Sequence, residues 1–163
     1  MLFANNEYPL EGKVQWIGIR PSRTEEQIVL SAVDAIVGKG LEGDRYSGQS
    51  GKRDVSIIQA EHLEIVGRLL DKSTIDPLLT RRNIVVSGIN LVSLKGKTIR
   101  FGSAELEVTG PCAPCSKMEI NLGAGGYNAM RGHGGITARV VKTGTISVGD
   151  TLEVLPITIE HLV

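Results

Sequence analysis

The sequence has no net charge, no long apolar run and only two cysteines in 163 residues. Its 18 basic residues balance 18 acidic ones, which argues against a purely electrostatic partner such as a nucleic acid or an anionic membrane surface. No stretch is long and apolar enough to span a bilayer, and residues 1–7 contain neither a basic segment nor the apolar core of a signal peptide. We therefore expect a cytoplasmic protein without nucleic-acid or membrane partners, whose oligomeric state the sequence leaves open.

Common site motifs are also missing around the cysteines and histidines. Cys112 and Cys115 have C-x-x-C spacing, but no second such pair and no H-x-x-x-H follows, so structural zinc is not expected. A thioredoxin-like site needs a βαβ unit, and a cysteine–histidine hydrolase using His133 has no local support. The glycine-rich residues 123–135 lack the strand-to-helix frame of a Walker or dinucleotide motif. His62 lies among carboxylates on a predicted helix face, which favours a solvated side chain over a metal ligand.

The chain contains instead a series of short strand patterns separated by glycine. They cover residues 13–20, 27–37, 54–58, 84–86, 96–102, 104–109, 136–141, 144–149 and 152–154. The one clear helix pattern spans residues 60–72, and the last two stretches look like a hairpin. Many short strands and one main helix predict a mostly β (α+β) fold, a barrel or a sandwich, in a single domain over residues 1–163. A parallel α/β fold is disfavoured because crossover helices are missing.

Both cysteines lie in one proline-containing stretch, residues 110–119. Pro111 and Pro114 each precede a cysteine, and proline fixes φ and removes an N–H donor, so this stretch is expected to be a stiff turn. It separates a predicted strand from a predicted glycine-rich loop over residues 122–135. A thiol on a stiff turn in this position would be held in place and remain accessible. Burial is the commonest fate of a free cysteine, and we expect it for Cys112. Cys115 is the candidate functional thiol.

Arginine recurs beside glycine or a second arginine in the predicted loops. The segments are 43–45, 51–53, 81–83 and 131–134, and the first two fall in a long predicted loop over residues 40–53. Glycine lets the backbone approach a ligand closely, and arginine offers a planar fork to phosphate or carboxylate. Without a net charge, clustered loop arginines indicate a small anionic ligand. The alternative is a set of solvated charges, some paired with Asp44 and Asp54.

The order of these motifs resembles the MOSC domain, which is found at the C-terminus of molybdenum cofactor sulfurases. The resemblance rests on residues 40–45, 53–58, 81–84, 110–115, 131–132 and 144–150, and extends over about residues 13–155. It implies a largely β, barrel-like domain. The family's cysteine follows a proline and precedes a basic residue, which points to Cys115.

The resemblance also implies a molybdenum cofactor, molybdopterin, bound by this chain. By position, Cys115 would be the molybdenum ligand and the catalytic thiolate, because thiolate is a soft, strongly donating ligand. The implied cofactor contacts are Arg45, Arg53, Arg82, Asn83 and Arg131, with Asp44 organising its loop. Lys117 would favour the thiolate form of Cys115.

Three functions remain open from the sequence. The first is a reductase of N-hydroxylated compounds or a handler of the cofactor, and a reductase would need a separate redox partner. The second is a sulfur carrier for metal–sulfur cofactor assembly, in which Cys115 receives a persulfide from a cysteine desulfurase. Because no lysine context here marks a pyridoxal-phosphate site, that cofactor would belong to the desulfurase. The third is a small binding module whose cysteines are inert.

Overall fold

The chain forms many short β-strands, as the sequence predicts. The structure is a computed structural model that describes residues 7–45 and 51–156. Its strands are β1 (Gly12–Ile19), β2 (Ile28–Leu30), β3 (Ala32–Ile36), β4 (Gly40–Leu41), β5 (Val55–Gln59), β6 (Ile84–Ser87), β7 (Thr98–Phe101), β8 (Ala104–Pro111), β9 (Ile136–Lys142), β10 (Gly144–Ser147) and β11 (Thr151–Val154). The α-helices are α1 (Ala60–Leu69), α2 (Lys117–Leu122) and α3 (Gly126–Met130), and the 3-10 helices are η1 (Pro77–Thr80) and η2 (Leu91–Leu94).

Seven strands close into a barrel in the order β11-β7-β8-β9-β5-β6-β1, with β1 pairing back to β11. Strand β2 extends from β1, and a separate three-stranded sheet has the order β10-β3-β4. Burial alternates along β7 and β8, so that Ile99, Phe101, Leu106 and Val108 point into the core. The prediction of a mostly β, barrel-like fold is confirmed.

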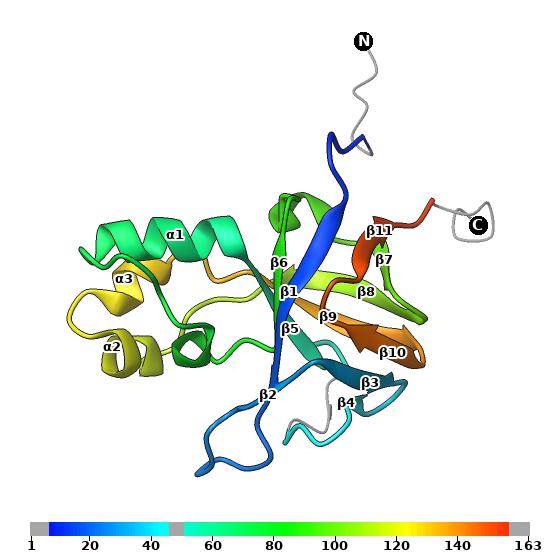
Figure 1. The fold of residues 1–163 in the computed structure, drawn as a ribbon, viewed down its shortest axis with the longest axis horizontal. Helices are drawn as coiled ribbons and strands as arrows, with labels where there is room; N and C mark the ends of the chain where they lie inside the picture. Colours follow the sequence, from blue (N-terminus) through cyan, green and yellow to red (C-terminus); the bar gives the residue numbers. More distant parts are fainter. Residues whose placement is uncertain (1–6, 46–50, 157–163) are drawn as a thin grey trace.

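One feature differs from the expectation that crossovers are missing. Strands β5 and β6 are parallel, with Ile57 opposite Ile84, and the chain between them contains α1. Parallel neighbours need such a crossover, and α1 supplies it by burying Leu63 and Val66 in a second apolar cluster outside the barrel. Figure 1 shows α1, α2 and α3 together on one side of the barrel. No helix in the described ranges is long and apolar enough to cross a membrane.

Three boundaries and one pairing were predicted wrongly. Residues 27–37 divide into β2 and β3 at Ser31, whose carbonyl oxygen accepts a hydrogen bond from Val148 N–H. The helix predicted to residue 72 ends at Leu69, and the predicted loop 122–135 contains α3. The strands β10 and β11 form no hairpin, because β10 pairs with β3 whereas β11 pairs with β1 and β7. The turn between them carries the chain from one sheet to the other.

Candidate functional site

The loop that carries the cysteines leaves the barrel at the end of β8 and enters α2. Cys112 N–H donates to the carbonyl oxygen of Gly135 (2.9 Å), and Met118 N–H donates to that of Cys115 (3.0 Å). The expected burial of Cys112 is confirmed, because its side chain is only 6% exposed, whereas Cys115 is exposed. The turn is shorter than the predicted residues 110–119, because α2 already begins at Lys117. Both prolines precede this helix and therefore do not interrupt it.

The buried side chain of Arg82 holds this loop in place through hydrogen bonds to backbone carbonyl oxygens. Its side chain is 5% exposed, and Nε donates to the carbonyl oxygen of Gly134 (2.7 Å). Nη1 donates to the carbonyl of Thr80 (3.0 Å), and Nη2 to those of Cys112 and Ala113 (3.4 Å each). No carboxylate of the described chain pairs with it. Arg82 therefore ties three segments together and leaves a buried positive charge without a protein counter-ion.

Asn83 has a similar positioning role beside it. Its Oδ1 accepts hydrogen bonds from the backbone N–H (3.0 Å) and hydroxyl (3.1 Å) of Ser56 on β5. Its Nδ2 donates to the carbonyl oxygen of Gly18 on β1 (3.1 Å). The amide thus joins β5 and β1 to the start of β6. Its Oδ1 and one N–H of its Nδ2 are used within the protein, and its predicted contact with a cofactor stays a prediction.

A pocket of about 360 Å³ opens between the cysteine loop and the barrel. It is lined by Arg20, Gln27, Asp44, Arg45, Arg53, Ser56, Arg81, Arg82, Asn83, Cys112 and Thr137. Five of these residues are arginines and only Asp44 is acidic. The Oδ1 atom of Asp44 accepts a hydrogen bond from the backbone N–H of Arg20 (2.8 Å), which ties the loop at Asp44 to the end of β1. The pocket wall is therefore strongly cationic and suited to an anion.

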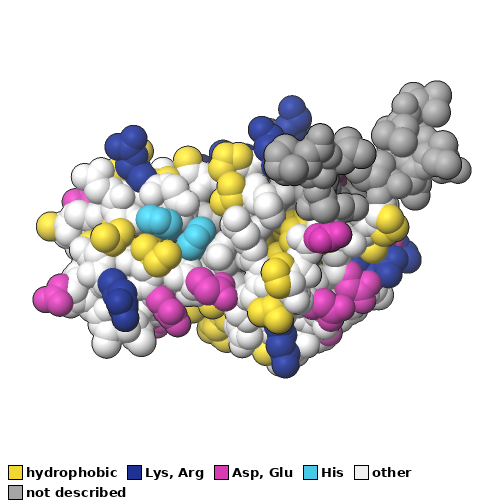
Figure 2. Space-filling view, turned by 90° about the horizontal axis from the view of Figure 1, so that it is seen from above, with side chains coloured by type: hydrophobic (Ala, Val, Ile, Leu, Met, Phe, Trp, Pro, Cys, Tyr) yellow, Lys and Arg dark blue, Asp and Glu magenta, His cyan; other side chains and the backbone are white. Residues whose placement is uncertain are grey.

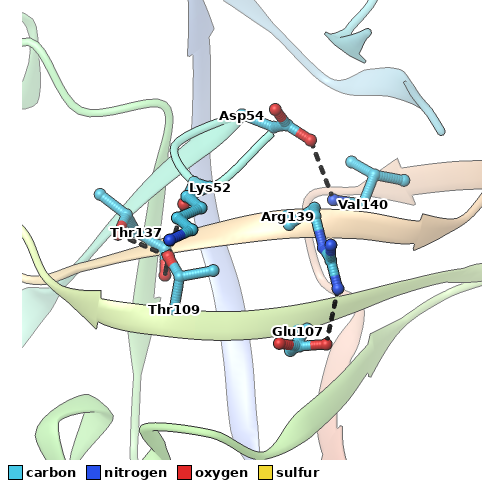
Figure 3. Close-up of polar contacts among 7 residues, drawn as sticks. All are labelled: Lys52, Asp54, Glu107, Thr109, Thr137, Arg139 and Val140. Carbon is cyan, nitrogen blue, oxygen red and sulfur yellow. Dashed lines mark hydrogen bonds and ion pairs between the residues drawn. The ribbon is translucent and has the colours of Figure 1, made fainter. Parts of the chain in front are cut away.

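The segment that carries Arg53 is pinned on both sides (Figure 3). The hydroxyl of Thr109 on β8 donates to the carbonyl oxygen of Lys52 and lies 2.8 Å from the hydroxyl of Thr137 on β9. On the other side, the buried carboxylate of Asp54 accepts a hydrogen bond from Val140 N–H (3.3 Å). Arg53 stands between these two anchors, which holds its backbone at the pocket.

A family model described as the MOSC domain matches residues 39–153. The chain belongs to the MOSC domain family. Domains of this family are associated in general with binding of the molybdenum cofactor. The resemblance inferred from the motifs is confirmed. The model begins after β3, so Arg20 and Gln27 reach the pocket of this MOSC domain from outside the matched range.

Solved structures of three similar proteins share the fold of this MOSC domain. The YuaD protein from Bacillus subtilis is 22% identical, with a TM-score of 0.79 over 91% of this chain and 98% of that chain. YiiM from Escherichia coli is 20% identical, with a TM-score of 0.69 over 92% and 72%. YiiM from Geobacillus stearothermophilus is 16% identical, with a TM-score of 0.73 over 92% and 78%. No curated protein matches the sequence.

Three cationic side chains of the MOSC domain interact electrostatically with Cys115. Burial lowers the pKa of Arg81, and the negative charge of a Cys115 thiolate opposes this effect. Burial, Arg81 and Arg45 lower the pKa of Arg20, whereas Asp44 and Cys115 raise it. The pKa of Lys117 is lowered, chiefly by Arg81. These mutual effects place Arg20, Arg81 and Lys117 in one electrostatic cluster with the exposed thiol.

Sequence reasoning missed Arg20 and Arg81 as site residues. Arg81 was part of a quoted motif, and it adopts a left-handed backbone conformation (φ 61°) at the end of η1, which is uncommon for a residue with a side chain. Arg20 follows β1 and carries no local signal. Conversely, the predicted cofactor residue Arg131 is exposed at the end of α3 and does not line the pocket.

The two described histidines form a pair away from the pocket, side by side on one face and next to apolar side chains (Figure 2). Their ring centroids are 5.1 Å apart, and His133 Nδ1 lies 3.0 Å from the carbonyl oxygen of Ala129. His62 is partly exposed on its helix, but its Nδ1 is buried without a hydrogen-bond partner among the described residues. No group of three or more potential metal ligands occurs in the described ranges.

The histidine pair predicts a loss of stability in acid. Burial, and then the neighbouring His133, lower the pKa of His62 below its ordinary value of 6.5. The unfolded chain therefore takes up this proton first, and stability falls as the pH drops through that value. We expect the thermal unfolding midpoint to fall between about pH 7.5 and pH 5.5, and less steeply in His62→Gln. Equal slopes in the two proteins would contradict this effect.

Proposed function

We propose that this MOSC domain holds an anionic molybdenum–pterin cofactor in the arginine-lined pocket and reduces N-hydroxylated compounds with it. The observation that carries the proposal is a pocket with five arginines and one carboxylate, two of whose arginines, Arg20 and Arg81, interact electrostatically with the exposed thiol of Cys115. Cys115 itself is not one of the lining residues, whereas Cys112 is. Arginine forks match the geometry of phosphate oxygens, and thiolate sulfur is a soft ligand suited to molybdenum. Cys115 is the proposed ligand.

The chemistry of the donor set fits such a group. Arg82 is buried without a carboxylate partner, and a buried charge is costly unless an opposite charge lies near it. Arg20, Arg45, Arg53 and Arg81 form no ion pair with a carboxylate of the described chain, so their guanidinium groups are available to an anion. The pocket thus offers several N–H donors to the phosphate of a cofactor.

The residues of this chain would bind and orient the anionic cofactor and balance its negative charge. Arg82 fixes the backbone of the cysteine loop, and Arg20, Arg81 and Lys117 would place positive charge close to a ligand held at Cys115. The bound cofactor would supply a metal that exchanges two electrons and an oxygen atom. Reduction of an N–OH group consumes two electrons and two protons and yields an N–H group and water. The electrons would come from a separate redox partner protein.

Elemental and pterin analysis tests the proposal. Protein purified from cells that make the molybdenum cofactor is expected to carry molybdenum and pterin in equal amounts. Protein from cells unable to make the pterin serves as the control and should carry neither. Absence of both from the first preparation would contradict the proposal.

The exposure of Cys115 also supports a second function, transfer of sulfur. A pyridoxal-phosphate-dependent desulfurase would convert free cysteine to alanine and pass its sulfur to the Cys115 thiolate as a persulfide. Cys112 is buried but lines the pocket, and it would act as a helper in this transfer. Protein that lacks molybdenum but gains the mass of one sulfur atom on Cys115 would favour this function over the reductase.

A further inference from the structure

Arg81 is brought to the cysteine loop by the packing of η1 on α2. At this contact, Asn121 Nδ2 of α2 donates to the carbonyl oxygen of Leu79 in η1 (3.1 Å). Arg81 directly follows η1, and Cys115 lies just before α2. The side chains of Arg81 and Cys115 also interact electrostatically. The exposed thiol and this guanidinium group therefore belong to one surface site.

The backbone of Arg81 adopts a conformation that favours glycine. Its φ and ψ are 61° and 22°, and among the described residues other than glycine only Asp71 also has a positive φ. The left-handed region costs free energy for a residue with a Cβ atom, and such strain occurs mainly where a side chain is needed at a site. A glycine at this position would avoid the cost but would lack the guanidinium group. The strain therefore indicates a use for the Arg81 side chain.

The charge near the thiol is mostly positive. Arg20 and Lys117 also interact electrostatically with Cys115. Asp44 is the only carboxylate among the described groups that influence the charged state of Arg20, Arg81 or Lys117. None of these three cations forms an ion pair with a carboxylate of the described chain. An anion that approaches Cys115 therefore meets an excess of positive charge.

A positive environment matters most when a thiolate reacts with an anion. Two negative charges repel each other on approach, and fixed cations offset this repulsion and stabilise the charge of an anionic leaving group. Arginine also donates paired hydrogen bonds to the oxygens of an oxyanion. The pocket lined by Arg20 and Arg81, with a volume of about 360 Å³, has room for a small one. Because thiolates attack the sulfur of sulfur–sulfur bonds, the fitting reactant is an oxyanion with such a bond.

We propose that the cofactor-free protein takes sulfur onto Cys115 directly from a small sulfur oxyanion, of which thiosulfate is the simplest, with Arg20 and Arg81 holding the oxygens. The thiolate attacks the terminal sulfur of thiosulfate, and the sulfur–sulfur bond of the donor breaks. Sulfite leaves with the bonding electron pair, and Cys115 becomes a persulfide anion. The step needs no oxidant. It goes beyond the reductase function, and unlike the sulfur transfer described above it requires no desulfurase.

Turnover with thiosulfate and cyanide tests this proposal on protein from cells unable to make the pterin. Cyanide takes the outer sulfur of the persulfide, leaves as thiocyanate and regenerates the thiolate. One thiosulfate and one cyanide thus give one sulfite and one thiocyanate. We expect both products in equal amounts, and without cyanide the protein should gain the mass of one sulfur atom, located on Cys115 by peptide analysis. Cys115→Ser should show neither the products nor the gain in mass.

Arg81→Gly separates the effect of the charge from that of folding. Because glycine adopts a φ of 61° without strain, the unfolding midpoint should stay equal or rise. The rate of sulfite release is divided by the rate of alkylation by uncharged iodoacetamide, which corrects for a change in the thiolate fraction. This ratio should fall by about tenfold in Arg81→Gly, and Arg81→Lys should restore most of it.

The matched control is Arg68→Gln, which removes one positive charge from an exposed position on α1 outside the pocket. Its ratio should equal that of the unaltered protein. Thiocyanate formation no faster than without protein, equal turnover by Cys115→Ser, or an unchanged ratio in folded Arg81→Gly would each overturn the proposal. Because the protein in this test carries no molybdenum, either result leaves the reductase function to be decided by the elemental analysis.

Discussion

Replacing Cys115 with serine is expected to remove molybdenum from the purified protein, whereas Cys112→Ser keeps it. A serine hydroxyl stays protonated at neutral pH and is a poor substitute for a soft thiolate ligand, so the molybdenum content should fall by at least about tenfold. Cys112 lies three residues away but is buried, and its backbone rather than its sulfur contacts Arg82 and Gly135. The two variants are thus closely matched in sequence and differ in exposure.

The measurement is molybdenum and pterin content per chain, with the unfolding midpoint of each variant as a check on folding. Burying a hydroxyl in place of the Cys112 sulfur should cost about 1–3 kcal/mol of stability. Retention of molybdenum by folded Cys115→Ser would contradict the assignment of the ligand. Loss of molybdenum from Cys112→Ser with an unchanged midpoint would transfer the assignment to Cys112.

The second large effect is expected at Gly135. A methyl group there would overlap the carbonyl oxygen of Ile57 on β5, and the glycine has a positive φ of 85°. Its own carbonyl oxygen accepts the hydrogen bond from Cys112 N–H, so a displaced Gly135 also displaces the cysteine loop. We expect Gly135→Ala to lower the free energy of unfolding by at least about 3 kcal/mol and to prevent loading with molybdenum.

Gly132→Ala separates the backbone strain from the clash. Gly132 has a similar φ of 79°, but no atom lies within 4 Å of the position of an added methyl group. Only the left-handed conformation is then penalised, at about 1 kcal/mol. Chemical denaturation of both variants measures the difference. Equal losses would show that the contact with Ile57 is unimportant.

The individual strands of the barrel could be predicted from the sequence, because the pattern that indicates a strand lies within a few consecutive residues. The alternation along β7 and β8 is visible in single residues, because one side chain in two faces the core. The pairing of β10 and β11 was predicted wrongly, because a glycine turn between two strand patterns looks the same whether the strands pair with each other or with distant partners. Only tertiary contacts with β1, β3 and β7 distinguish these cases.

In the candidate site, too, the residues with a local sequence signal could be predicted and those positioned by tertiary contacts could not. Cys115 could be singled out because its prolines and its basic neighbour are adjacent in the chain. Arg20 and Gln27 could not, since they reach the pocket through the pairing of β1 and β2. Arg82 was found, but its burial and its four carbonyl partners were invisible in the sequence. The sequence does not distinguish a buried arginine from an exposed one. Only the tertiary packing shows whether an arginine can contact a ligand or instead supports the backbone.

The closure of the barrel between β1 and β11 links the site to the folding of the chain. These are the first and last strands of the described ranges, so the ring is completed only when segments more than a hundred residues apart have met. Contacts of such high sequence separation carry a large loop-closure entropy and slow the folding reaction. Arg20 directly follows the other end of β1, which pairs with β2 and β6. The same strand therefore closes the barrel at one end and brings an arginine to the cationic pocket at the other, so a cofactor would find a complete pocket only after β1 has paired with β6.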